Sequence, residues 1–73
     1  MPVINVKAVE GVFDASEKRE IVERLTDAIV AIKGENLRQV TVCMVEEVKS
    51  GDYAIAGNPL TTEFALEILS AAN

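Results

Sequence analysis

Apolar and polar positions alternate from the first residues of the chain. Between residues 2 and 9, one set of alternate positions is uniformly apolar, and the other set mixes apolar with polar side chains. A period of two is that of a β-strand, and Pro2 suits the first residue of a strand because proline has no N–H to donate to a ladder. The pattern predicts a strand over residues 2–9, with its apolar face against a helix.

The pattern then changes to a helical period. The apolar positions recur at spacings of three and four, and they are Ile21, Val22, Leu25, Ala28, Ile29 and Ile32. Asp14 and Ser16 are both candidate N-caps, and a glutamate three residues after Asp14 gives the spacing of a capping box. Gly34 suits the position after a helix, and Lys33 complements the negative end of the helix dipole. We therefore expect a helix over residues 16–33.

A second strand is predicted over residues 39–46, which are nearly continuous in apolar character, as in strands covered on both faces. A strand, a helix and a strand in this order form a βαβ unit with parallel strands. After a turn-rich segment, a short apolar arm covers residues 53–56, and Pro59 is expected to stop it. A short helix capped by Thr61 or Thr62 is expected to end the chain.

Composition indicates that the chain is too apolar to be a stable monomer. Its 73 residues are 49% hydrophobic, whereas a domain of this size buries only about 60% of its unfolded surface. We expect a single domain over residues 1–73 of the α/β (α+β) class. The protomer would be a βαβ unit with a short β-arm and a short C-terminal helix, and identical protomers would form an oligomer.

Charge and cysteine content exclude several functional classes. The formal net charge of −5 argues against nucleic-acid binding, because no basic stripe is available to neutralise phosphates. No apolar run approaches the roughly 20 residues that span a bilayer, and no signal-peptide pattern is present. The chain has no histidine and no zinc pattern, and its one cysteine, Cys43, is read as a small buried hydrophobe. These features favour a cytoplasmic protein without a metal.

Pro2 is the main candidate for chemistry. Its ordinary role would be to begin a strand. If the initiator Met1 is removed, as a small second residue permits, Pro2 becomes the chain terminus and its nitrogen becomes a free secondary amine. A terminal amine titrates near pH ~8. Burial or a neighbouring cation would lower this pKa and make the amine a general base at neutral pH.

Together these segments resemble the 4-oxalocrotonate tautomerase family, the short-chain branch of the tautomerase superfamily. The matching features are the Met-Pro-Val-Ile start, Glu-Gly at the end of the first strand, the amphipathic helix, the second strand and the arm Asp-Tyr-Ala-Ile-Ala-Gly. The resemblance implies βαβ protomers that assemble into dimers, commonly three dimers to a hexamer. It also implies an isomerase without cofactor or metal, in which Pro2 moves a proton between carbons of a small enol or 2-oxo acid.

The same resemblance suggests substrate-binding residues. Tyr53 matches the aromatic residue that walls the family's pocket, once one extra residue is allowed before it. The family's prototype carries two arginines that bind the substrate carboxylate and polarise its carbonyl, and the matching positions here hold Val12 and Thr41. Thr41 offers one neutral hydrogen bond, and Arg38, just before the second strand, is a candidate replacement cation. Lys7 and Lys49 are further candidates, and the prototype's dicarboxylate substrate is not expected.

Two alternatives to the isomerase stay open at this point. A proline amine that remains protonated would act as a general acid, in hydration or dehalogenation of an unsaturated acid. A chain that kept only the scaffold would be a non-catalytic oligomeric protein, with Pro2 merely starting a strand.

Overall fold

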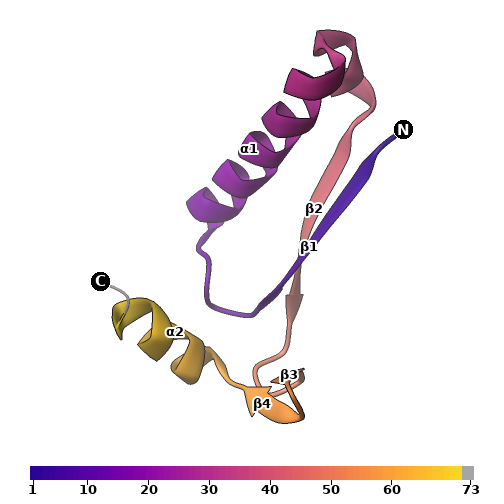
Figure 1. Ribbon diagram of the computed structural model, residues 1–73. Coiled ribbons are helices and arrows are strands. Elements are labelled where there is room, and N and C mark those ends of the chain that lie inside the picture. The colour runs from indigo at the N-terminus through magenta and orange to yellow at the C-terminus, as the bar shows by residue number, and fades with distance from the viewer. Residues whose placement is uncertain (72–73) are drawn as a thin grey trace.

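The computed structural model describes residues 1–71 and shows the predicted βαβ order, followed by a hairpin and a second helix (Figure 1). The elements are β1 (Val3–Val9), α1 (Ala15–Lys33), a 3₁₀ helix η1 (Glu35–Val40), β2 (Val42–Val48), β3 (Tyr53–Ile55), β4 (Asn58–Leu60) and α2 (Thr62–Ala71). The βαβ unit, the short β-arm and the C-terminal helix confirm the fold class predicted from the sequence.

Strands β1 and β2 form a parallel sheet, in register from Val3 opposite Val42 to Val9 opposite Val48. Helix α1 lies along one face of this sheet (Figure 1). The alternation in β1 follows the prediction, because the inward positions are half-buried and the outward ones exposed. The inward residues are Ile4, Val6 and Ala8, and the outward ones are Val3, Asn5 and Lys7. Among the described residues, only Val9 and Val30 are buried hydrophobic residues, at 4% and 6% exposure.

The other face of the sheet is uncovered in a single chain, and it carries apolar side chains beside the polar group of Asn5, Lys7 and Glu46. Val3, Val42 and Met44 are 63%, 48% and 38% exposed. The chain exposes 5340 Å², against about 4400 Å² expected for a folded monomer of 7.9 kDa. Its radius of gyration is 14.8 Å, against about 11 Å expected for a compact domain of this length. The protomer is therefore more extended than a self-sufficient monomer.

Helix α1 ends where the sequence predicts and begins one residue earlier, at Ala15. Asp14 caps it: Oδ1 of Asp14 accepts from the backbone N–H of Glu17 at 2.8 Å, and Oε1 of Glu17 accepts from the N–H of Asp14 at 2.9 Å. Ser16, the other candidate cap, lies inside the helix and donates its hydroxyl to Asp14. Gly34 ends the helix with φ 107° and donates its N–H to the carbonyl of Val30 at 2.7 Å.

The second strand begins later than predicted. Residues 39 and 40 belong to η1, and β2 starts at Val42. The reason is local hydrogen bonding: Leu37 N–H donates to the carbonyl of Gly34 at 3.1 Å, and Thr41 N–H donates to the carbonyl of Arg38 at 3.3 Å. These short-range bonds occupy the backbone groups that a longer strand would use in its ladder.

The arm is a hairpin rather than a single strand. β3 and β4 pair antiparallel, with Ala54 opposite Pro59. The prediction that Pro59 ends the arm is wrong, because this proline lies within β4, where an edge strand tolerates a missing N–H. The turn uses Ala56 and Gly57, which both have positive φ. Thr61 caps α2 by accepting from the N–H of Phe64 at 3.1 Å.

Candidate active site

Pro2 is fixed at the edge of the sheet just before β1. Its carbonyl oxygen accepts from the backbone N–H of Val42 at 3.0 Å, so the start of β1 is tied to the start of β2. The pyrrolidine ring is half-buried. The position of the ring is therefore set by the sheet ladder and not by a free chain end.

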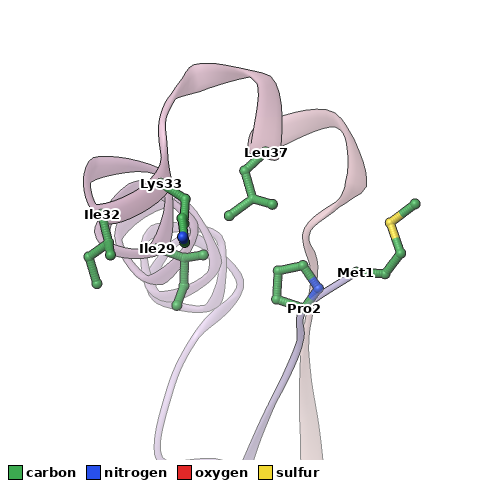
Figure 2. Close-up of a pocket in the computed structure, with 6 residues that line it drawn as sticks. All are labelled: Met1, Pro2, Ile29, Ile32, Lys33 and Leu37. Atoms are coloured by element: carbon green, nitrogen blue, oxygen red, sulfur yellow. The ribbon is translucent and has the colours of Figure 1, made fainter.

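A hollow of about 430 Å³ opens beside Pro2 (Figure 2). Its lining residues are Met1, Pro2, Ile29, Ile32, Lys33 and Leu37. The βαβ path explains this meeting, because α1 runs back along the sheet and its last turn arrives beside the start of β1 (Figure 1). The volume lies in the usual range for small-molecule sites, about 300–1,000 Å³.

The walls of this hollow are mainly apolar. Figure 2 shows Ile29 and Lys33 on the helix side, Pro2 on the strand side and Leu37 reaching down from η1. Met1 is 89% exposed, and while it is attached, the Pro2 nitrogen is a tertiary amide without useful basicity. The arrangement can hold an apolar small molecule against Pro2, with one cationic side chain at its rim.

Arg38 does not line this hollow, because two carboxylates hold its guanidinium. Nη1 donates to Asp27 Oδ1 at 2.8 Å, and Nε donates to Glu35 Oε1 at 2.6 Å. The hydrogen bonds to Glu35 and then to Asp27 raise the pKa of Arg38 above its usual value. In this protomer Arg38 is therefore engaged by protein carboxylates.

Thr41 does not line the hollow at Pro2, although it directly precedes Val42, which bonds to the Pro2 carbonyl. The hydroxyl of Thr41 donates to the carbonyl of Leu37 at 2.8 Å, so its one donor is in use. Arg38 and Thr41 share a second hollow of about 250 Å³ with Cys43 and residues of α1. The structure thus brings two of the predicted substrate-binding residues together, at a place other than the hollow of Pro2.

Tyr53 lies at the far end of the molecule. It begins β3 (Figure 1), beyond the end of β2, whereas Pro2 is bonded to the first residue of β2. The 7 residues of β2 span roughly 23 Å at about 3.3 Å per residue. In one protomer, Tyr53 cannot wall the hollow at Pro2, and only a second copy of the chain could bring it there.

Sequence reasoning missed Lys33 as a site residue. The spacing of Lys33 with Ile29 and Ile32 on the last turn of α1 was the available signal, but the residue was explained by the helix dipole alone. The other candidate cations lie elsewhere: Lys7 is on the outer sheet face, 3.5 Å from Glu46, and Lys49 follows the far end of β2.

Neither helix within residues 1–71 has the length and apolar character that a bilayer-spanning segment requires.

Comparison with known proteins identifies the family. The family described as "Tautomerase enzyme" matches residues 2–63. The chain is 36% identical to a 2-hydroxymuconate tautomerase of Bacillus subtilis (strain 168), over 84% of this chain and 95% of that protein. It is 39% identical to a Staphylococcus aureus (strain Mu50) protein named a probable tautomerase, over 78% of this chain and 90% of that protein.

Similarity to a solved structure supports the same family assignment. The crystal structure of DmpI from Helicobacter pylori superposes with a TM-score of 0.71 at 28% identity, covering 81% of this chain and 95% of that one. Sequence and fold therefore agree over the βαβ unit and the hairpin, and the chain belongs to the tautomerase family of isomerase-type enzymes.

Proposed function

We propose that this chain is a keto–enol isomerase whose general base is the amine of Pro2, formed when Met1 is removed. The observation that carries the proposal is the position of Pro2, held by Val42 at the edge of an apolar hollow that Ile29 and Leu37 also line. The substrate is a small enol or 2-oxo acid.

The proton transfer needs only this amine. Neutral Pro2 accepts the hydroxyl proton of the enol, and the oxygen electrons form the carbonyl as the carbon–carbon double bond shifts. The displaced π electrons take a proton from the pyrrolidinium at the terminal carbon, which regenerates the neutral amine. One O–H bond breaks and one C–H bond forms, so no cofactor is required.

The walls of the hollow favour the basic form. Ile29 and Leu37 shield one side of Pro2 from water, and desolvation lowers the pKa of an ammonium group. The cationic Lys33 acts in the same direction. No carboxylate of the described residues lines this hollow, which disfavours the alternative in which a protonated proline acts as general acid.

We also propose that the active enzyme is a homo-oligomer, with a hexamer of three dimers as the expected form. The exposed outer sheet face and the exposed apolar residues of α2 support this assembly; Phe64 and Ile68 are 52% and 50% exposed. A neighbouring copy would then supply Tyr53 as an apolar wall with a phenolic donor.

Intact-mass analysis of native protein, followed by an enol tautomerisation assay, tests the proposal. A mass lacking the initiator methionine, together with turnover of an aryl-pyruvate enol, is the expected result. Protein without Met1 that fails to turn over any enol would favour the non-catalytic scaffold. A rate that rises as pH falls would favour the general-acid mechanism.

A further inference from the structure

We propose that Lys33 binds the carboxylate of the substrate in the hollow at Pro2. The assignment rests on the isomerase function proposed above, and it narrows the substrate class to an enol or 2-oxo acid with one carboxylate and a small apolar group. In the family's prototype, two arginines bind the substrate carboxylate. The matching positions here hold Val12 and Thr41, and Lys33 would take over that role.

The distribution of ion pairs singles out this residue. Four of the seven lysines and arginines are paired with carboxylates, namely Lys7, Lys18, Arg24 and Arg38. Within residues 1–71, Arg19, Lys33 and Lys49 form no ion pair. Of these three, only Lys33 lines the hollow that contains Pro2.

No carboxylate within residues 1–71 is paired with Lys33. The acidic residues that flank Lys33 in the sequence are Asp27 and Glu35. Both are bound by Arg38, at 2.8 Å and 2.6 Å. Neither carboxylate is therefore paired with Lys33, and no acidic side chain of the described residues lines the hollow. A substrate carboxylate can therefore bind the ammonium group of Lys33 without displacing a protein carboxylate.

The walls define how such a substrate would lie. The lysine is on the helix side of the hollow and the proline is on the strand side (Figure 2). A carboxylate at Lys33 leaves the enol group facing Pro2 and places the apolar part of the substrate against Ile29, Ile32 and Leu37. One cation accommodates one carboxylate, so a second carboxylate would lie on an apolar wall.

Lys33 also complements the negative end of helix α1, and that role alone would explain a lysine in the last turn. A purely structural lysine would affect folding, but it would not distinguish a charged substrate from its neutral ester. The test therefore compares an acid with its ester on the same preparation.

The experiment uses Lys33→Gln, with Arg19→Gln as the matched control on the same helix. For the enol of phenylpyruvate, Lys33→Gln should lower kcat/KM about tenfold to a hundredfold, the usual value of a charge-assisted contact. For the enol of methyl phenylpyruvate the change should stay below about threefold, because its ester carries no charge for the lysine to bind. Arg19→Gln should leave both values near those of the parent. An equal loss for acid and ester, or no loss for the acid, would overturn the assignment.

Equilibrium binding separates this assignment from the proposed activity. Phenylacetate, an unreactive carboxylate, should bind the parent and the Arg19→Gln control alike and Lys33→Gln about tenfold or more weakly, as measured by NMR titration. Binding by the parent without enol turnover would refute the isomerase function and leave the carboxylate site standing. Turnover by the parent with equal phenylacetate affinity in Lys33→Gln would refute the carboxylate site alone.

Discussion

Arg38 and Asp27 are eleven residues apart in the sequence, yet Nη1 of Arg38 lies 2.8 Å from Oδ1 of Asp27. The contact ties η1 back onto α1. The same guanidinium also binds Glu35, so Arg38 holds one carboxylate from α1 and one from η1. The sequence suggested Arg38 as a substrate ligand, whereas its contacts in this protomer are those of a residue that sequesters negative charge.

A rescue experiment distinguishes these two roles of Arg38. Arg38→Gln should lower kcat/KM for an aryl-pyruvate enol about two- to fivefold, because the released carboxylates of Asp27 and Glu35 would reduce the positive potential at the substrate site. The effect should be small because both carboxylates are exposed to solvent. Adding Asp27→Asn and Glu35→Gln to this variant should restore the parent value. Steady-state kinetics of the three proteins would decide the matter. A triple variant no better than Arg38→Gln would identify Arg38 as a direct ligand.

The base is tested by Pro2→Ala, measured on protein without Met1. A positioned general base is worth about 10²–10⁴-fold, and the substituted alanine would keep a primary amine, so we expect a large loss of kcat/KM with some residual activity. Pro59→Ala, at the chain's other proline, is the control. Pro2→Ala with parental activity and an unchanged oligomer would remove the amine from the mechanism.

The pH dependence of kcat/KM should report the same amine. The base must be neutral to accept a proton, so activity should fall as pH drops through its pKa. Desolvation and the charge of Lys33 should both lower this pKa from the ordinary value of a terminal amine, near pH ~8. The acidic limb should therefore lie below about pH 8, and Lys33→Gln should move it upward. An acidic limb that Lys33→Gln leaves in place would mean that the lysine is electrostatically remote from Pro2.

Substrate preference follows from the residues at the two family arginine positions. With Val12 and Thr41 there, a dicarboxylate such as 2-hydroxymuconate should be a poorer substrate than an aryl-pyruvate enol. Each missing charge-assisted contact costs roughly 1.5–3 kcal/mol, or about tenfold to a hundredfold in kcat/KM. Val12→Arg and Thr41→Arg should each raise kcat/KM for the dicarboxylate. Thr41→Arg also removes the hydrogen bond to Leu37 at 2.8 Å, which makes Val12→Arg the cleaner variant. Efficient dicarboxylate turnover by the parent would contradict this prediction.

The exposed outer face of the sheet predicts how assembly can be broken. Met44 is 38% exposed among the apolar residues of this face, and Met44→Lys should dissociate the oligomer because burial of a lysine there would be costly. Ala31→Lys, at an exposed position of α1, is the control. Size exclusion with light scattering should show a hexamer, or at least a dimer, for the parent and the control. A parent that is monomeric at micromolar concentration would refute the assembly.

Local sequence signals were sufficient for the βαβ unit. Alternation set the inward face of β1, and the capping box of Asp14 with Glu17 and the glycine at position 34 set both ends of α1. These features depend on contacts within one or two turns, so they can be read from neighbouring residues. The start of β2 was misplaced because residues 39 and 40 close a 3₁₀ turn, which an apolar run does not reveal.

The sequence by itself also determined that a strand would begin next to Pro2, and it predicts more apolar surface than a lone monomer would bury. Only the tertiary structure decided that Lys33 shares a hollow with Pro2, that Arg38 is held by Asp27 and Glu35, and that Tyr53 is a strand's length away. The physical reason is that these relationships depend on how α1 and η1 pack beside the sheet and on how far β2 carries the chain from Pro2. That arrangement joins residues far apart in the chain, and no local period of apolar residues records it.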